Sequence, residues 1–371
     1  MRRSRTLATL TSLTAAALLA TGCTAPAESQ DSAPAAGGEE TITVTDQRGV
    51  EVTLDGPAES IASAVIPAPA ILAAVDGSWD RISGINQSLL DANKQGIISQ
   101  IFPDSVTTLV ISGPDFVPNM EEVLAADPDV VIQWGDMGDE VISPLEQAGL
   151  PVIGLEYGTQ EDLETWIDLF GDVIGKPERA DEIIAWMHDE AEAVSAQVES
   201  LDAESPRALS LSYSQQSLSV DTASDYAQHV FDVTGLTNVA KDAPVTDGVV
   251  NAEQIIEWDP EIIFLSAFSP ATPQDVYDDP RLSEISAVKD KRVYRAPLGV
   301  YRWQVPSAES PLYWNWVAAL AYPGQFEVDL PAEMREQTSF LYNYELSDGD
   351  VDLELRSDIN DVSADYALVS E

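Results

Sequence analysis

The sequence predicts an α/β protein with two Rossmann-like lobes, each containing a parallel sheet, joined by one long rigid α-helix. Short apolar runs alternate with helical patterns along the chain, and this alternation is typical of parallel sheets covered by helices on both faces. A pattern of 14 residues recurs 132 positions further on, and a long helical run without glycine lies between the two copies. We therefore expect two similar lobes on either side of a connecting helix.

Length, composition and charge narrow the class of protein. The chain has 371 residues, 44% of them apolar, which is enough for two buried cores. Against 64 acidic residues stand only 18 lysines and arginines, a formal net charge of −46. This charge argues against nucleic acid and anionic membrane surfaces as partners. We interpret it as the solvated surface of an exported protein; a specific store of cations is the alternative.

The first 22 residues have the layout of a secretory signal peptide. Three arginines precede an apolar stretch that ends in small residues before Cys23. The stretch is too short for a membrane span and is diluted with threonine and serine. Residues 19–23 (LATGC) resemble a bacterial lipobox, which implies that the Cys23 thiol carries a diacylglyceryl group after cleavage. An inert free cysteine is the alternative; an intrachain disulfide is excluded because Cys23 has no second cysteine to pair with.

We therefore expect an exported protein, anchored by lipid to the outer face of the cell membrane. Residues 23–40 would hold the lipidated cysteine and a flexible linker, since they are rich in alanine, proline, serine, glycine and acid.

Residues 41–176 are expected to form the N-terminal lobe. Two segments of alternating polarity flank the turn Asp46-Gln47-Arg48-Gly49, which predicts an opening hairpin. Continuous apolar runs then predict buried strands at 60–65, 81–85, 130–134 and 151–155.

The connecting helix is expected at 177–201. This run has a proline in its first turn, no glycine, and apolar residues near helical spacing. At 1.5 Å per residue it would be about 37 Å long, and such a stiff element permits less opening and closing than flexible strands would. The C-terminal lobe, 202–345, should contain strands at 208–213, 261–265 and 292–296. Residues 346–371 are acidic with few turn-spaced apolar residues, so we expect an acidic C-terminal extension on the surface.

The repeat places a helix capped by asparagine, an Asp-Pro stop and a buried strand at the same place in each lobe. Residues 119–132 align with 251–264 with four identities, a match that common α/β patterning could also produce. Glu121 and Glu253 occupy the same position, two residues after the capping asparagine. The helix dipole alone favours acidic residues there, so these glutamates need no partner.

Five segments occur in a characteristic order behind the signal peptide: 44–54 (VTDQRGVEVTL), 119–132, 175–180 (GKPERA), 234–240 (TGLTNVA) and 250–256 (VNAEQII). In this order they resemble the helical-backbone, or class III, substrate-binding proteins of ABC importers, which receive iron-siderophores, haem and vitamin B12. Residues 301–312 (YRWQVPSAESPL) are similar to a subset of that family that binds iron complexes.

The resemblance implies a binding protein without catalysis and without a cofactor. Its ligand would be a small-molecule metal chelate, a ferric siderophore first, with cobalamin or haem as alternatives. Its partner would be an ABC permease with its ATPase. In the family, one glutamate per lobe docks onto arginines of the two permease subunits, and Glu121 and Glu253 match those positions. We expect a monomer.

Ligand contacts are expected where predicted strands end, because open α/β sheets bind ligands beyond the carboxyl ends of their strands. Tyr301, Arg302 and Trp303 follow a turn after the strand at 292–296. A guanidinium between two aromatic rings suits a flat anionic chelate, since it combines charge-assisted hydrogen bonds with ring contact. Three further aromatic residues end strands in the same way and are expected to join the site: Trp134, Tyr157 and Tyr213.

Other chemistry finds less support. The chain has two histidines, His188 and His229, so a His-rich metal clamp is not available. A lipid-anchored chelatase or hydrolase on the same scaffold is the alternative from another class. No G-x-S-x-G, H-E-x-x-H, P-loop or Cys-His pair is present in the sequence, which weighs against it. Recovery of the bound ligand chemically unchanged would distinguish binding from catalysis.

Overall fold

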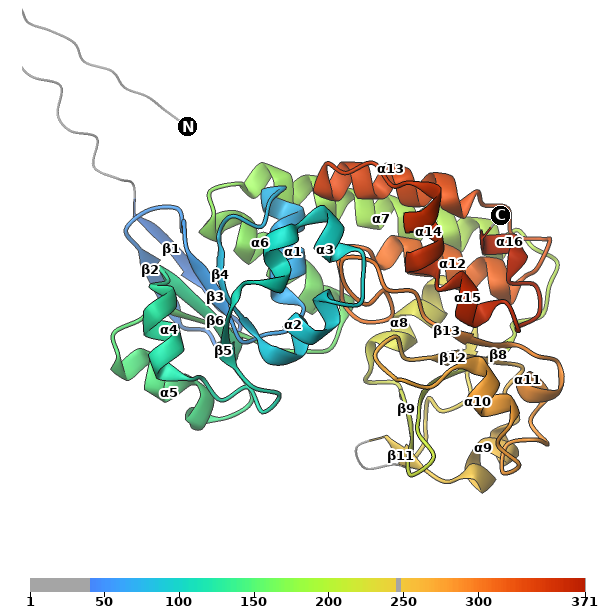
Figure 1. Cartoon of the computed structure of the whole chain (residues 1–371). Helices are drawn as coiled ribbons and strands as arrows, with labels where there is room; N and C mark the ends of the chain where they lie inside the picture. The colour runs from blue at the N-terminus through green and yellow to red at the C-terminus, as the bar shows by residue number, and fades with distance from the viewer. Residues whose placement is uncertain (1–40, 245–247, 371) are drawn as a thin grey trace, which may run out of the picture. The chain divides into compact units, whose positions relative to one another are not determined.

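The computed structural model describes residues 41–244 and 248–370 (Figure 1). The predicted signal peptide, Cys23 and the linker at 23–40 lie outside the described residues. The described chain opens with the expected hairpin, in which β1 (Ile42–Thr45) and β2 (Glu51–Leu54) pair antiparallel. Asp46 closes the turn, because its Oδ1 accepts hydrogen bonds from the backbone N–H groups of Arg48 and Val50, both at 3.0 Å.

The N-terminal lobe contains a five-stranded parallel sheet in the order β5-β4-β3-β6-β7. Four strands match the predicted ones, and β5 at one edge was not predicted from the sequence. Their bounds are β3 Ile61–Ser63, β4 Ile82–Asn86, β5 Leu109–Ser112, β6 Val130–Trp134 and β7 Val152–Leu155. The helices are α1 Ala68–Asp76, α2 Gln87–Asn93, α3 Ile98–Ile101, α4 Met120–Ala126, α5 Asp139–Gln147 and α6 Gln160–Val173, with a 3₁₀ turn at Pro103–Val106.

Helices cover both faces of this sheet, which explains why its strands read as continuous apolar runs. Ile132 and Ile153 belong to the large core that also holds α1 and α6. Val131 and Val152, one residue earlier on each strand, point to the other face and pack with residues of α4 and α5. The side chains therefore alternate between two apolar layers.

The C-terminal lobe has a mixed sheet in the order β11-β9-β8-β12-β13, with β10 also beside β8. The strands β8, β12 and β13 are parallel, as predicted, whereas β9 pairs antiparallel with both β8 and β11, and neither β9 nor β11 was predicted. The strands are β8 Arg207–Tyr213, β9 Leu218–Val220, β10 Thr237–Asn238, β11 Val249–Val250, β12 Ile262–Leu265 and β13 Val293–Arg295. The helices are α8 Tyr226–Val233, α9 Ala252–Trp258, α10 Pro273–Tyr277, α11 Ser286–Lys289 and α12 Ser310–Ala321.

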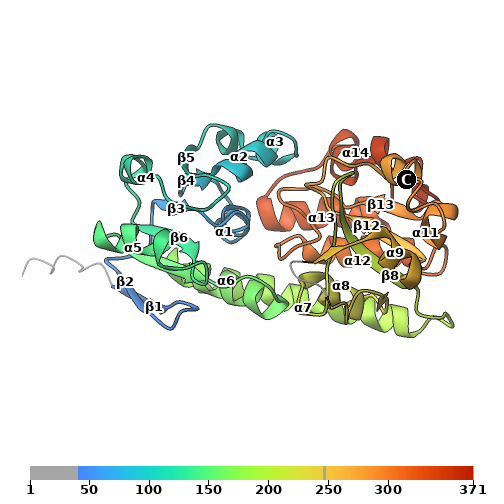
Figure 2. The same ribbon diagram turned by 90° about the horizontal axis from the view of Figure 1, so that it is seen from below.

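The predicted connecting helix is present as α7 (Pro177–Glu199), two residues shorter than expected at its end. Pro177 occupies the first helical turn, where its missing N–H costs nothing. The helix packs against α6 of the N-terminal lobe and against α8 and α12 of the C-terminal lobe (Figure 2). Its buried residues belong to one continuous apolar core that includes residues of both lobes.

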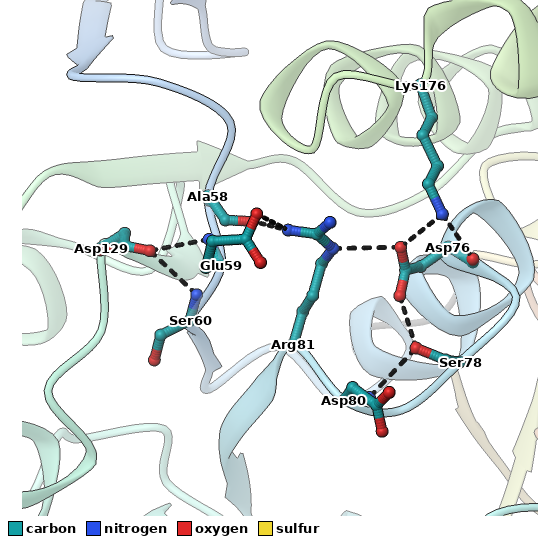
Figure 3. A network of polar contacts seen from close by, with 9 residues as sticks. All are labelled: Ala58, Glu59, Ser60, Asp76, Ser78, Asp80, Arg81, Asp129 and Lys176. Atoms are coloured by element: carbon teal, nitrogen blue, oxygen red, sulfur yellow. Dashed lines mark hydrogen bonds and ion pairs between the residues drawn. The ribbon is translucent and has the colours of Figure 1, made fainter. Parts of the chain in front are cut away.

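A network of polar contacts fixes the start of α7 to the N-terminal lobe (Figure 3). Lys176 Nζ lies 2.7 Å from Asp76 Oδ1, and Arg81 Nε donates to the same oxygen at 3.1 Å. Arg81 also reaches the carbonyl of Ala58 and the carboxylate of Glu59. Burial opposes ionisation of Asp76, but the hydrogen bonds from Lys176, Ser78 and Arg81 outweigh it and lower the pKa of Asp76.

The C-terminal residues differ from expectation. Instead of a surface extension, they form α14 (Asp348–Leu355), α15 (Ser357–Asn360) and α16 (Ala367–Ser370), which follow α13 (Leu330–Tyr342). Asn360 accepts a hydrogen bond from the backbone N–H of Arg295 at 2.7 Å and donates to the Arg295 carbonyl at 3.0 Å. Leu355 and Val369 are fully buried. Few positions face the core on such short helices, so the sequence shows no helical period.

The two repeat copies adopt the same local structure. Asn119 caps α4 and Asn251 caps α9, each accepting a hydrogen bond from a backbone N–H in the first turn. Both helices end at an aspartate in the left-handed conformation, Asp127 with φ 45° and Asp259 with φ 41°. A non-glycine residue there is uncommon, so its presence in both copies supports a structural repeat beyond the four sequence identities. Within the described residues, no helix has the length and apolar character needed to span a bilayer.

Candidate functional site

Two aromatic residues at the ends of β6 and β7 form a wall of the N-terminal lobe. Trp134 is 6% exposed and packs edge-to-face on Tyr157, with ring centroids 5.7 Å apart. Trp166 of α6 completes a cluster of three rings, with its centroid 6.0 Å from that of Trp134 and 6.4 Å from that of Tyr157. Tyr157 keeps 45% of its surface exposed. The buried Trp134 therefore supports the Tyr157 ring from inside the lobe, and the exposed part of the Tyr157 ring is accessible to a ligand.

The opening hairpin holds the loop that carries Tyr157. Gln47 Oε1 accepts hydrogen bonds from the backbone N–H of Glu156 at 2.7 Å and from Trp166 Nε1 at 2.8 Å. Arg48 donates to the carbonyl of Val152 at 3.0 Å and lies so close to Gly154 that a side chain there would collide with it. The turn that the sequence marked as a hairpin is thus a positioning element for the first wall.

The second wall is the loop after β13, which a buried carboxylate holds in place. Glu309, 1% exposed, accepts hydrogen bonds from the backbone N–H groups of Val300 at 3.1 Å and Tyr301 at 2.9 Å. Burial raises the pKa of Glu309, although both hydrogen bonds favour its charged form. Because Arg302 follows these residues directly, Glu309 fixes the backbone from which Arg302 extends.

Arg302 lies over an aromatic ring and has no acidic partner. Its Cζ is 4.1 Å from the ring centroid of Phe268, which follows β12, and 5.1 Å from that of Tyr301. Its Nη2 donates to the Tyr301 hydroxyl at 2.8 Å. Among the residues that the structure describes, no carboxylate lies within 4 Å of the guanidinium, and its Nε is buried without a hydrogen-bond partner.

Two further arginines gather near Phe268. Arg295, at the end of β13, donates to the carbonyl of Ala267 at 3.1 Å. Arg356, at the end of α14, lines a cavity of about 240 Å³ together with Ala267 and Phe268. Burial and the positive charge of Arg295 lower the pKa of Arg356 to about 10. Neither arginine has a carboxylate within 4 Å in the described part of the chain, and both have an unpartnered buried Nε.

The cavity beside Arg356 is lined from both lobes. The N-terminal lobe contributes four residues in or near α2, and the C-terminal lobe adds Leu298 to the three residues named above; the four are Ser88, Asp91, Ala92 and Gln95. The carboxylate among them, Asp91, is 60% exposed and already lies 3.6 Å from Lys94 Nζ.

Electrostatics link Tyr157 to the arginine side of the site. Although 45% of the Tyr157 surface is exposed, the surrounding protein raises the pKa of its hydroxyl by desolvation, and the charge of Arg302 acts in the opposite direction. Burial also raises the pKa of Asp221 to about 6, while its hydrogen bond from Ser210 at 2.5 Å and the Arg302 charge favour its ionised form. The charge of Arg302 thus acts on the pKa of Tyr157 in the N-terminal lobe and of Asp221 in the C-terminal lobe.

Three residues that the sequence predicted as ligand contacts are buried. Trp303 is fully buried and Tyr301 is 1% exposed, so neither ring is offered to a ligand; Tyr301 supports Arg302 instead. Tyr213 lies on the opposite face of its sheet, where its hydroxyl donates to Asp279 at 3.0 Å. Side chains alternate along a strand, so a residue at a strand end points to either face, and Tyr213 points to the side of α10.

The structure adds residues that the sequence analysis did not assign to the site. Arg295 ends a predicted strand and could have been selected by the rule that selected Arg302. Phe268 follows β12 in the same way. Arg356 gave no signal, because the segment that carries it was interpreted as a surface extension. In the described residues, no three histidine, cysteine, aspartate or glutamate side chains group as metal ligands would.

Glu121 and Glu253, the predicted docking residues, are exposed near the starts of α4 and α9. They do not line the cavity beside Arg356.

A two-lobed α/β chain with a connecting helix and a site lined from both lobes is the architecture of a class III solute-binding protein of ABC transporters. The chain belongs to the periplasmic binding protein family, whose model matches residues 70–298. Members of this family bind and deliver solutes and are not enzymes.

The structure is similar to that of a periplasmic solute-binding protein from Veillonella parvula, with a TM-score of 0.78 and 33% identity over 87% of this chain and 99% of that one. The molybdate-binding protein MolA of Haemophilus influenzae is 25% identical over 57% of this chain and 66% of its own length. The vitamin B12-binding protein of Vibrio campbellii is 27% identical over 40% of this chain and 53% of its own. The chain thus spans about half to two thirds of these curated relatives.

Proposed function

We propose that this protein captures an anionic metal complex, a ferric siderophore first, and delivers it to the permease of an ABC importer. The observation that carries the proposal is the group of three arginines around Phe268. Arg302 lies over the Phe268 ring, Arg295 donates to the carbonyl of the adjacent Ala267, and Arg356, which is distant in sequence from both, lines the same cavity as Ala267 and Phe268.

The lack of acidic partners at these arginines is unusual in a chain this acidic. Five other arginines lie within 4 Å of a carboxylate: Arg48, Arg81, Arg179, Arg281 and Arg335. Two more, Arg207 and Arg292, donate to carbonyls at the ends of α9 and α12, where the helix dipole is negative. Partly buried cations without a contacting carboxylate are costly, and an anionic ligand would lower that cost.

The aromatic residues suit a ligand with a flat, polarisable surface. Tyr157 presents an exposed ring from the N-terminal lobe, and Phe268 lines the cavity from the C-terminal lobe. A catecholate siderophore complex carries negative charge on aromatic rings, and therefore matches both the guanidinium groups and the rings. This match, with the similarity of residues 301–312 to binders of iron complexes, favours a ferric siderophore.

A simple oxyanion is the second candidate, because MolA is named for molybdate and arginines bind oxyanions well. Cobalamin and haem remain further candidates, the former because of the vitamin B12-binding relative. If the protein were instead a chelatase, the ligand recovered after binding would be chemically changed.

A binding screen tests the proposal. Quenching of tryptophan fluorescence should be followed with ferric enterobactin as an anionic siderophore complex, ferrichrome as a neutral one, molybdate, cyanocobalamin and haemin. We expect ferric enterobactin to bind and ferrichrome to bind far more weakly. Binding of molybdate alone would identify an oxyanion protein. Binding of cyanocobalamin alone would overturn the anionic site, and recovery of a modified ligand would overturn the binding function.

For delivery, we propose that Cys23 tethers the protein to the membrane and that Glu121 and Glu253 dock onto the two permease subunits. The support for the docking role is that Glu121 and Glu253 occupy equivalent positions in the two repeat copies and that both are exposed. Exposed charges at an interface mainly set encounter rate and register, which suits a partner that must bind and release.

A further inference from the structure

Exposed aliphatic side chains recur at the same positions of the two repeat copies. The described residues include ten exposed large apolar side chains, and four of them form two pairs separated by 132 positions. Val117 and Val249 are 44% and 54% exposed, and Leu124 and Ile256 are 57% and 38% exposed. The same separation relates Glu121 to Glu253. Each lobe therefore carries one glutamate with one aliphatic residue before it and one after it.

The local structure explains why these side chains are found together. Leu124 lies three residues after Glu121 on α4, and Ile256 lies three residues after Glu253 on α9, so each aliphatic residue shares a helix face with its glutamate. Val117 and Val249 each precede a residue in an antiparallel bridge, Pro118 with Ser112 and Val250 with Leu218.

In the C-terminal lobe these residues line one hollow. Val249, Glu253 and Ile256 border a pocket of about 430 Å³, together with Leu218 and Arg281. The glutamate therefore stands in a partly apolar surface, and an ion pair formed there would be partly shielded from water.

Folding alone does not account for the arrangement. Exposure of a large aliphatic residue carries no benefit for the monomer, and single exposed residues are normal. The repetition of both aliphatic positions around the same glutamate is not explained by chance scatter or by the helix dipole, because the dipole acts on Glu121 and Glu253 but not on valine, leucine or isoleucine.

We propose that Val117 and Leu124 in one lobe, and Val249 and Ile256 in the other, form two apolar contacts that surround the docking glutamates. The occupant is the outer surface of a two-subunit permease, each subunit presenting a basic side chain set in apolar surface. This inference rests on the proposed function and adds the partner's chemistry to it. Two equivalent patches on one chain match two equivalent subunits, since each patch meets the same surface.

The two components of such a patch respond differently to salt. Ion pairs at exposed sites weaken as ionic strength rises, whereas apolar contacts persist. Loss of one half-exposed leucine or isoleucine contact in each lobe should weaken docking about tenfold. That loss should be the same at low and high salt.

The test measures docking of the purified full-length chain, without ligand, to the permease–ATPase complex of the same cells held in nanodiscs, at 50 and 500 mM NaCl. The test variant carries Leu124→Ser with Ile256→Ser, and a second carries Val117→Ser with Val249→Ser. A charge variant carries Glu121→Gln with Glu253→Gln. The matched control carries Leu353→Ser with Leu368→Ser, two leucines of similar exposure, 42% and 49%, outside the repeat.

We expect both aliphatic variants to dock about tenfold more weakly at either salt concentration, and the control to dock like wild type. The charge variant should be weakened mainly at 50 mM. Wild-type docking by both aliphatic variants, with the charge variant weakened, would overturn the apolar contacts and leave the proposed function standing. If the control variant, Leu353→Ser with Leu368→Ser, docked as weakly as the aliphatic variants, the proposed apolar contacts would also be overturned. A charge variant that docks like wild type would instead refute the docking role of the glutamates.

Discussion

Replacement of Arg302 by alanine tests the ligand site most directly. Its guanidinium is held over Phe268 at 4.1 Å and has no carboxylate within 4 Å among the described residues, so no contacting carboxylate compensates its positive charge. Loss of a hydrogen bond to a charged group costs about 1.5–3 kcal/mol, which corresponds to a roughly 10- to 150-fold loss of affinity. Arg302→Lys should recover part of the loss, because an ammonium keeps the charge but lacks the planar fork.

Fluorescence titration with ferric enterobactin at two salt concentrations is the assay. The affinity for ferric enterobactin should depend less on salt concentration in Arg302→Ala than in wild type, because one positive charge near the ligand has been removed. Arg335→Ala is the matched control: Arg335 pairs with the exposed Asp348 on the surface, and its loss should leave binding unchanged. Thermal unfolding should show that Arg302→Ala is folded. An affinity for ferric enterobactin that Arg302→Ala leaves unchanged would refute the assignment of this arginine to the ligand.

Three further predictions concern delivery, anchoring and stability. Glu121→Ala and Glu253→Ala should each reduce uptake into cells while the affinity for ligand in solution stays the same; a large loss of ligand affinity would place that glutamate in the ligand site instead. Cys23→Ala should release the protein from membranes, because a diacyl modification supplies the two chains that stable anchoring needs, and continued retention in the membrane fraction would contradict this. Asp76→Asn should lower the free energy of unfolding by about 1–3 kcal/mol at neutral pH in urea titrations. The folded-state pKa of Asp76 is lowered, so its stabilisation is complete above the ordinary value of 3.8 and is lost as pH falls through the lower folded value. The difference between Asp76→Asn and wild type should therefore shrink in acid, and a difference that persists at low pH would show that Lys176 does not stabilise the charge.

The central strands could be predicted because burial on both faces leaves a plain signal. Strands such as β6 and β12 read as unbroken apolar runs, and the structure places them within a residue or so of the predicted positions. The strands that the sequence did not reveal are at or near sheet edges. β9 and β11 contain three and two residues, too few for alternation to stand out.

The site was only partly predictable, since sequence gives the strand end but not the face. Arg302 and Tyr157 were selected because they follow strands, and both lie at the candidate site. Tyr213 satisfied the same rule but points to the other side of its sheet. Arg356 reaches the site because the C-terminal helices dock on the lobe through contacts such as Asn360 to Arg295, and no local pattern encodes that long-range contact.

The continuity of α7 also determines which fluorescent labels could detect ligand binding. The helix is tied to the N-terminal lobe by Lys176 and to the C-terminal lobe by Ser195, whose hydroxyl donates to the Val233 carbonyl at 3.0 Å. A pair of dyes on the two lobes would therefore change its energy transfer little on binding, because a stiff helix of about 35 Å sets their separation. A single environment-sensitive dye at position 157 would respond to the ligand itself. Cys23 is the only cysteine of the chain, so Cys23→Ser with Tyr157→Cys leaves one thiol for its attachment.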